Sequence, residues 1–95
     1  MDAERVLVDV SELAPPEPLA VAMDAAERLA PGQYLQIHHW REPLLLYEKL
    51  ARRDFGYDTR LGQDDCCEVF VWRLDDPSAK ESANNAASPL PPWRE

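Results

Sequence analysis

The sequence lacks the features that define several large classes of protein. It has no apolar run approaching the ~20 residues of a membrane-spanning helix. It opens with Asp2 and Glu4, where a secretory signal peptide would carry a basic segment. Its ten basic side chains are outnumbered by eighteen acidic ones, for a net charge of −8, so no binding to nucleic acid or to an anionic membrane is expected. These absences predict a cytoplasmic protein whose partners are proteins or small molecules.

Cysteine and histidine are also scarce, with two of each. Cys66 and Cys67 are adjacent and have no other cysteine to pair with, so a disulfide framework is not possible. Neighbouring residues on a strand point to opposite faces, so neither this pair nor His38 and His39 can share one metal ion. No metal site and no cofactor are therefore expected.

Length and composition indicate one small domain, residues 1–74, followed by a tail. Residues 75–95 are rich in Ser, Ala, Asn and Pro and show no apolar period, which predicts a disordered segment. Two alternatives concern its end. Residues 89–94 form a polyproline-type docking motif, or Trp93 folds back onto the domain.

Prolines and glycines separate the elements expected in the first half of the domain. Alternating valines predict a strand over residues 6–10. Pro16 and Pro18 suit the first turn of a helix that runs to about Leu29, because amide hydrogens there have no partner within the helix. Residues 33–40 then predict a second strand. A strand, a helix and another strand normally form a right-handed parallel crossover.

In the second half of the domain a helix again begins at a proline, and a hairpin follows it. Residues 41–43 open a second helix that closes at Arg52 and Arg53, and two strands follow over residues 56–61 and 66–73. The predicted fold is α+β: a two-layer α/β sandwich of order β-α-β-α-β-β, with two helices on one face of a four-stranded mixed sheet.

Four segments carry a resemblance to a known superfamily: LAPPEPL (13–19), LAPGQYL (29–35), REPLLLY (41–47) and VFVW (69–72). Over about residues 6–73 the chain resembles a group of uncharacterised bacterial domains of the TusA-like (SirA-like) superfamily. In its sulfur carriers, a strand leads into a Cys-Pro-x-Pro motif whose cysteine carries persulfide sulfur at a helix N-terminus. Pro15 stands at that cysteine position here. The resemblance implies the same fold without this thiol, in a context of nitrogen-oxide or redox metabolism.

In this topology the ends of the first two strands and the starts of both helices meet at one edge, the usual place for a ligand. Prolines at the helix starts have no N–H to donate, so a phosphate cradle is not expected there. Arg41 is placed to hold a carboxylate, and the alternative is a salt bridge to Glu17, Glu42 or Asp9. The predicted ligand or partner edge comprises Pro15, Pro16, Glu17, Pro18, His39, Arg41, Glu42, Pro43 and Tyr47.

The histidine and the cysteines near this edge each have both a chemical and a structural interpretation. His39 faces the helices and is either a proton carrier or metal ligand, or a hydrogen-bonded structural residue. Cys66 and Cys67 lie within the acidic segment 64–68, which should raise the pKa of both thiols. Cys67 is expected in the core and Cys66 partly exposed.

Strand alternation places a group of aromatic side chains on the face that points away from the two helices. Such groups commonly mark protein contacts, so this face is predicted to bind a partner or to form a weak homodimer. The alternatives are that the C-terminal tail covers it with Trp93 inserted, or that the fourth strand has the opposite register. The predicted aromatic sheet face comprises Tyr34, Trp40, Phe70 and Trp72.

No nucleophile, acid–base pair or metal cluster is well placed by the sequence. The favoured function is therefore a non-catalytic binding or regulatory module for a small molecule or a protein. The alternative is a divergent sulfur-transfer accessory protein that uses Cys66 or Cys67.

Overall fold

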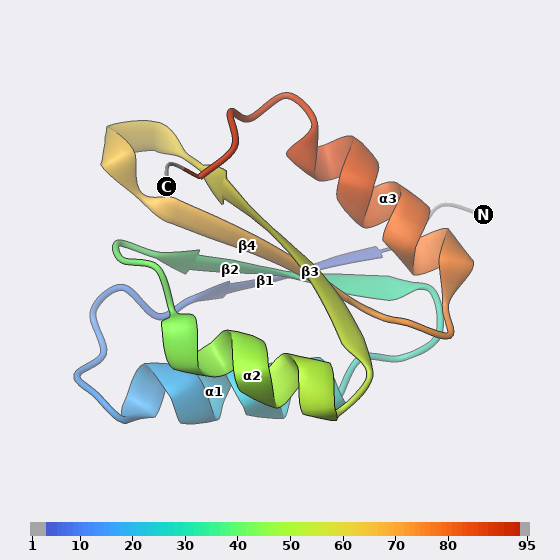
Figure 1. The fold of residues 1–95 in the computed structure, drawn as a ribbon, viewed down its shortest axis with the longest axis horizontal. Coiled ribbons are helices and arrows are strands. Elements are labelled where there is room, and N and C mark those ends of the chain that lie inside the picture. Colours follow the sequence, from blue (N-terminus) through green and yellow to red (C-terminus); the bar gives the residue numbers. More distant parts are fainter. Residues whose placement is uncertain (1–3, 94–95) are drawn as a thin grey trace.

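The computed structural model describes residues 4–93 and contains four strands and three α-helices (Figure 1). A single 3-10 turn, η1, links the last two strands. The elements in chain order are β1 (Glu4–Asp9), α1 (Glu17–Glu27), β2 (Gln33–His39), α2 (Leu44–Arg52), β3 (Phe55–Leu61), η1 (Gln63–Asp65), β4 (Cys67–Arg73) and α3 (Pro77–Ala87).

The four strands form one mixed sheet in the order β1-β2-β4-β3. β1 and β2 are parallel and joined through α1, while β4 is antiparallel to both of its neighbours. The predicted α+β class, the β-α-β-α-β-β order and the mixed four-stranded sheet with two helices on one face are confirmed. Within the described residues, no helix is both long and apolar enough to cross a membrane.

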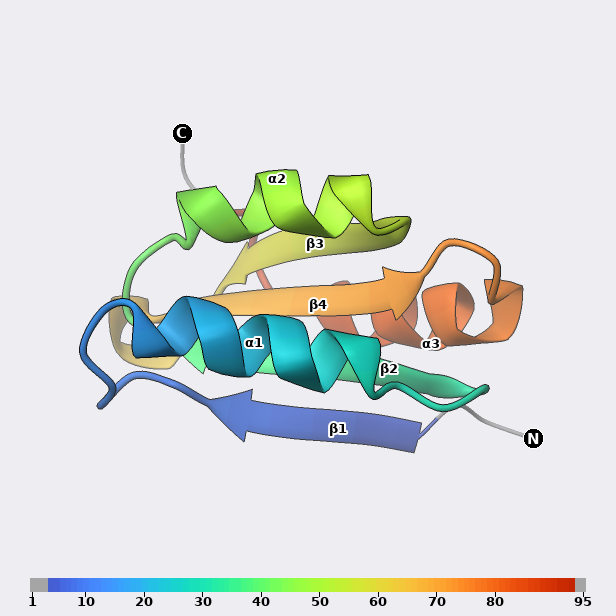
Figure 2. The same cartoon turned by 90° about the horizontal axis from the view of Figure 1, so that it is seen from below.

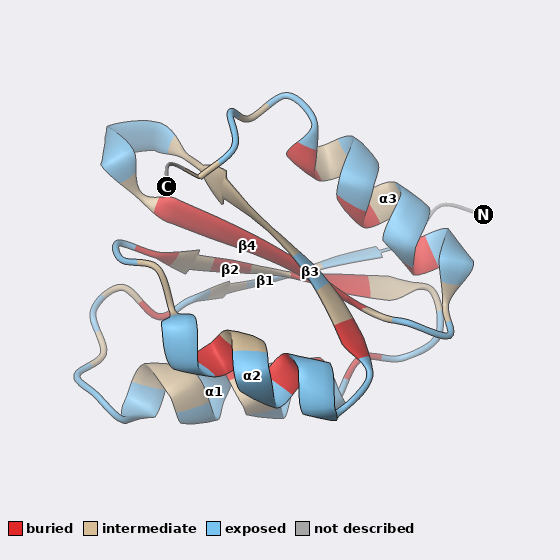
Figure 3. Cartoon of the chain, viewed as in Figure 1, coloured by how far each residue is buried: buried red, intermediate tan, exposed pale blue. Residues whose placement is uncertain are grey.

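The main core lies between the sheet and the helices α1 and α2, which run side by side on one face (Figure 2). Ala22 and Ala26 of α1, and Leu46 and Leu50 of α2, are buried against this face. The sheet supplies the side chains that strand alternation predicts for it, which are Leu35, Ile37, Val69 and Val71. Buried residues accordingly concentrate on the central strands β2 and β4 (Figure 3).

Helix α3 packs on the opposite face of the sheet and forms a second core. Its Ala79, Ala83 and Ala87 are fully buried and pack with the aromatic residues Tyr34, Phe70 and Trp72. Alanine at every fourth position gives a narrow, smooth stripe, so the helix can lie close to large aromatic rings. Pro77 at the helix start and the Asp76 side chain, which accepts a hydrogen bond from the Ala79 amide, define the N-terminus.

Two predictions are therefore wrong. Residues 77–87 are helical, so the expectation of a disordered tail over 75–95 does not hold for them. The predicted open aromatic face is also covered: Tyr34, Phe70 and Trp72 are at most 6% exposed. Trp40 lies beyond the end of β2 and is 65% exposed, away from this second core. A homodimer through an open aromatic face consequently has no such face to use.

The chain after α3 runs along the edge of β3. Leu61 donates its amide hydrogen to the Pro91 carbonyl at 2.9 Å, and Trp93 donates to the Thr59 carbonyl at 3.2 Å. The Trp93 side chain packs against the main core. The tail thus returns to the domain, as one alternative anticipated, but alanines of α3 and not Trp93 cover the aromatic residues.

Candidate functional site

A pocket of about 320 Å³ opens where β2 ends and where α1 and α2 begin. Three segments build it: the loop from β1 into α1, the end of β2, and the loop into α2. The structure brings together seven of the nine residues predicted for the ligand edge, namely Pro15, Pro16, Pro18, His39, Arg41, Glu42 and Pro43. Glu17 lies exposed in the first turn of α1 and does not line the pocket, and Tyr47 lies behind the pocket wall.

The interior of the pocket is apolar. Leu13, Leu19, Ala22, Ile37 and Leu46 contribute to its lining. All of them also belong to or pack against the main core, so the walls are held by the fold itself. Three large apolar side chains at the pocket are strongly exposed, with Trp40 at 65%, Leu44 at 66% and Leu45 at 72%. A hollow with an apolar interior and exposed apolar residues around it favours an apolar ligand.

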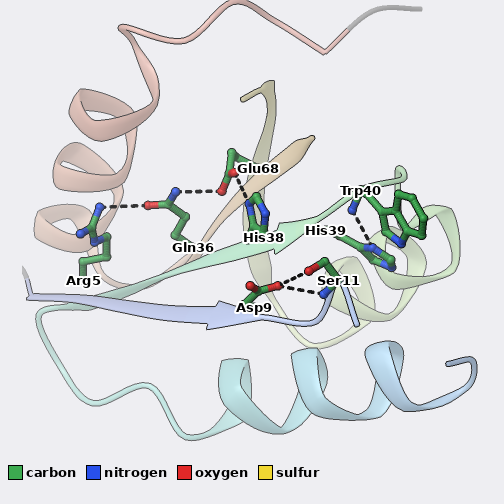
Figure 4. A network of polar contacts seen from close by, with 8 residues as sticks. All are labelled: Arg5, Asp9, Ser11, Gln36, His38, His39, Trp40 and Glu68. Carbon is green, nitrogen blue, oxygen red and sulfur yellow. Dashed lines mark hydrogen bonds and ion pairs between the residues drawn. The ribbon is translucent and has the colours of Figure 1, made fainter. Parts of the chain in front are cut away.

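His39 is the last residue of β2 and is only 7% exposed. Its Nδ1 accepts a hydrogen bond from the Trp40 amide at 2.8 Å, so the neutral ring carries its proton on Nε2 (Figure 4). Burial lowers the pKa of His39, and the charges of Arg41 and His38 lower it further, against a smaller opposing effect of Asp9. Nε2 has no hydrogen-bond partner among the described residues and is not sealed from solvent. The Nε2–H group is therefore a free donor, and it belongs to a residue that lines the pocket.

Arg41 follows two residues later and is exposed. Within residues 4–93, no carboxylate pairs with its guanidinium group and no hydrogen bond engages it. The expected alternative, a salt bridge to Glu17, Glu42 or Asp9, is therefore wrong. The Asp9 carboxylate instead accepts hydrogen bonds from the amide (2.9 Å) and hydroxyl (2.6 Å) of Ser11 (Figure 4), and these bonds lower its pKa.

Glu42 is occupied by a residue behind the pocket. The Tyr47 hydroxyl donates to Oε2 of Glu42 at 3.0 Å and lies 2.5 Å from the Thr59 hydroxyl. The Tyr47 ring stacks on Tyr57 with 4.5 Å between ring centroids and an angle of 2° between the planes. Burial, together with the nearby Glu42 carboxylate, raises the pKa of Tyr47, so the phenol stays protonated and keeps its donor. Tyr47 thus acts on the predicted edge by holding Glu42.

The two cysteines are poor candidates for a reactive site. Cys67 is fully buried in the main core, and burial with the charges of Glu42 and Glu68 raises its pKa to about 12. Cys66 is partly exposed, and desolvation with the charge of Asp64 raises the pKa of its thiol as well. Because the thiolate is the nucleophile, neither side chain is activated. The predicted places of both residues, in the core and at the surface, are confirmed.

A second polar cluster lies on the α3 face of the sheet and was not predicted. Glu68 is 7% exposed and accepts hydrogen bonds from His38 Nδ1 and from the Gln36 amide group, while Arg5 donates to Gln36 (Figure 4). The antiparallel register of β2 and β4 pairs His38 with Glu68 directly. Within residues 4–93, no three His, Cys, Asp or Glu side chains are grouped so that they could hold a metal ion.

Comparison with known proteins places the chain in a family. Residues 7–73 match the model of a family described as "Uncharacterized conserved protein (DUF2249)". The match runs from β1 through β4 and ends before α3. No curated protein and no solved structure was found to match the sequence. Because the matched segment spans well over half of the chain, the chain belongs to this family of uncharacterized conserved proteins, DUF2249.

Proposed function

We propose that this chain is a non-catalytic binding module that holds a small ligand in the pocket between the starts of α1 and α2. One observation carries the proposal: an apolar pocket of about 320 Å³ is lined by Arg41 and His39, whose guanidinium group and Nε2–H have no partner among the described residues. Pockets that bind small molecules typically combine an apolar lining with a few polar groups that fix orientation. The volume lies at the small end of the range for such sites.

No catalytic role is proposed for this chain, because neither its cysteines nor the titratable side chains of the pocket are suited to one. Both thiols have raised pKa values, and Cys67 is buried. Among the pocket residues, His39 uses Nδ1 to accept from Trp40, which leaves its neutral ring no free acceptor. A general base needs a free acceptor near the reacting group. His39 therefore suits recognition better than proton abstraction, and the Glu42 carboxylate is held by Tyr47.

The resemblance to TusA-like domains is part of this proposal. In that reading, Pro15 occupies the position of the sulfur-carrying cysteine, and the edge that would present persulfide in a carrier lines a pocket here. The proposed link to nitrogen-oxide or redox metabolism rests on the same resemblance. Sulfur transfer through Cys66 or Cys67 is the less favoured alternative, because the surroundings of both thiols oppose ionisation.

The proposal is tested by titrating ¹⁵N-labelled protein with a library of small fragments and following backbone amide signals. We expect shifts for amides of the pocket segments, residues 13–22 and 37–46. The variant Ala22→Leu places a larger side chain in the pocket lining and should abolish them. The matched control Ala20→Leu makes the same change at an exposed position of α1 and should bind as the wild type does. Shifts confined to other surfaces, or equal binding by both variants, would refute the proposal.

The alternative is tested by intact-mass measurement after incubation with a persulfide donor. We expect no stable added sulfur. A sulfur adduct that disappears in Cys66→Ser or in Cys67→Ser would replace the binding module with a sulfur-transfer function.

A further inference from the structure

We propose that the ligand of this pocket is a small apolar monocarboxylate, with a hydrocarbon body in the pocket and its carboxylate on Arg41 and His39. This inference rests on the proposed function and names the class of ligand. A pocket of about 320 Å³ corresponds to about ten water-sized groups at ~30 Å³ each. An eight-carbon acid such as octanoate has this size.

Arg41 and His39 supply a pair of donors at the pocket. Both line the pocket and are two residues apart, with His39 at the end of β2 and Arg41 in the loop that follows. A guanidinium group offers two parallel N–H donors that match the two oxygens of a carboxylate. His39 Nε2–H adds a third, neutral donor. With no partner in the described residues, these donors make no internal bond that a ligand would have to displace.

Acidic residues near the pocket would repel an anion if their carboxylates lay against its donors. The Glu42 carboxylate accepts from Tyr47, whose hydroxyl also contacts Thr59 behind the pocket. Within residues 4–93, neither Glu42 nor Asp9 forms an ion pair with Arg41, so no direct contact neutralises the guanidinium group. Asp9 does act on His39, yet more weakly than Arg41. The Arg41 guanidinium therefore remains available to an anion in a chain whose net charge is −8.

The helix starts at this pocket suit a carboxylate better than a phosphate. Phosphate sites at helix N-termini depend on free backbone N–H groups. Pro15, Pro16 and Pro18 at the start of α1, and Pro43 at the start of α2, have none. The amides of Glu17 and Leu44 already donate to the carbonyls of Ala14 and Glu42. A phosphate would leave oxygens unpaired, whereas a carboxylate matches the donors that remain.

The lining of the pocket suits a ligand with a hydrocarbon body. Most of the lining is apolar and includes the aliphatic side chains of Leu13, Leu19 and Ile37, which offer no polar partner. Each CH₂ group of a ligand that the pocket buries adds favourable transfer out of water, so a chain of several such groups is favoured over a polar metabolite. An aliphatic lining that also includes the cation Arg41 favours an amphiphilic acid.

The experiment compares octanoate, 1-octanol and octylamine at pH 7 by calorimetry and by ¹⁵N amide shifts of the full chain. These probes share one hydrocarbon body and differ in the head group. Octanoate should bind with shifts at residues 37–46, octylamine should bind at least tenfold more weakly, and octanol should fall between them. If octanol or octylamine binds as tightly as octanoate, the pocket binds ligands but the carboxylate assignment is overturned. If none of the three shifts the pocket amides while fragments of another class do, the assignment again fails and the binding module stands.

Variants of Arg41 complete the test. Arg41→Met keeps a long side chain and removes the charge, and we expect it to weaken octanoate binding at least tenfold while octanol binding is unchanged. Arg41→Lys should retain part of the affinity. The matched control Arg52→Met removes the same charge from an exposed position at the end of α2 and should bind octanoate normally. Octanoate binding that is equal in Arg41→Met and wild type would overturn the proposal. A wild-type amide spectrum outside the pocket shows that each variant is folded.

Discussion

The carboxylate of Asp76 accepts a hydrogen bond from the backbone amide of Gly32 at 2.8 Å, although 44 residues separate them in the chain. The other oxygen of Asp76 accepts from the Ala79 amide at 3.1 Å and caps α3. Gly32 adopts a positive φ of 83° in the turn before β2, a conformation that favours glycine. One side chain therefore begins α3 and ties it to the domain that the family match covers.

The first prediction is that Asp76→Ala loosens α3. The substitution removes the helix cap and the bond to Gly32 together, so the amides of residues 79–87 should exchange their hydrogens several-fold faster than in the wild type. Hydrogen exchange measured by NMR reports this directly. Asp75→Ala is the matched control, because Asp75 is an exposed neighbour. Equal protection of α3 in both variants would show that the cap is not what holds the helix.

The same carboxylate predicts a dependence of stability on pH. The hydrogen bonds from Gly32 and Ala79 lower the pKa of Asp76 below its ordinary value of 3.8. Folding therefore favours the ionised form, so this contribution to stability is complete well above pH 3.8 and is lost as the pH falls through the lower folded pKa. Asp9 shifts in the same direction and remains in any Asp76 variant.

Urea unfolding between pH 7 and pH 2 tests this prediction. The stability of the wild type should fall more steeply below pH 4 than that of Asp76→Asn, which lacks the titrating group. Parallel curves for the two proteins would contradict the assignment of this carboxylate.

The sequence could predict the sheet and its first two helices because large apolar residues and prolines mark them. Leu35, Ile37, Val69 and Val71 alternate as buried strand residues should, and Pro16 and Pro43 stand directly before the two helices. Helix α3 escaped prediction because its buried face consists of alanines, which carry little hydrophobic signal. The face with Tyr34, Phe70 and Trp72 was correctly separated from the main core, but without α3 it seemed open.

The meeting of the pocket segments could also be predicted, since parallel neighbours such as β1 and β2 end at the same edge of a sheet. The sequence could not predict which charged groups remain unpaired, because pairing depends on side-chain geometry. Tyr47 engages Glu42, and Ser11 engages Asp9, which leaves Arg41 without either carboxylate. The pair of His38 and Glu68 depends on β2 lying beside β4, whereas the sequence indicated only that β4 pairs with β3.

A further prediction concerns the alanine stripe of α3. Ala83 is fully buried beside the aromatic residues of the second core, so Ala83→Asp would bury an unpaired charge and should destabilise the packed helix by about 3 kcal/mol or more. We expect α3 to detach, with stronger binding of a hydrophobic dye and a red shift of tryptophan fluorescence as Trp72 meets water. Asn84→Asp adds the same charge on the exposed side of α3 and should change neither signal. A wild-type dye response from Ala83→Asp would argue against the second core.

Position 56 in β3 has no room for a side chain larger than that of glycine. A methyl group at this position would lie 2.5 Å from indole atoms of Trp72, which is 6% exposed and has little room to move. Gly56→Ala should therefore cost about 1–3 kcal/mol in the free energy of unfolding, measured with urea. The double variant with Trp72→Phe removes the indole atoms that the methyl group meets, so its loss should be smaller than the sum of the two single losses. Additive losses would show that the contact with Trp72 is not the cause.

The last prediction concerns the hydroxyl of Tyr47. Tyr47→Phe keeps the ring stacked on Tyr57 but removes the donor that holds Glu42. Loss of this hydrogen bond should reduce the free energy of unfolding by about 0.5–1.5 kcal/mol. If the proposed carboxylate site is correct, octanoate affinity should also fall, because the released Glu42 carboxylate can compete for Arg41.

Two further variants separate these effects. Tyr57→Phe removes the hydroxyl of the stacking partner, which is 39% exposed, and should leave octanoate affinity unchanged. Adding Glu42→Gln to Tyr47→Phe removes the competing charge and should restore affinity, although the lost stability does not return. If Tyr47→Phe binds octanoate as the wild type does, Tyr47 stabilises the wall of the pocket but does not control its charge. If affinity falls and Glu42→Gln fails to restore it, the hydroxyl acts through the packing of α2 against β3, where it meets Thr59.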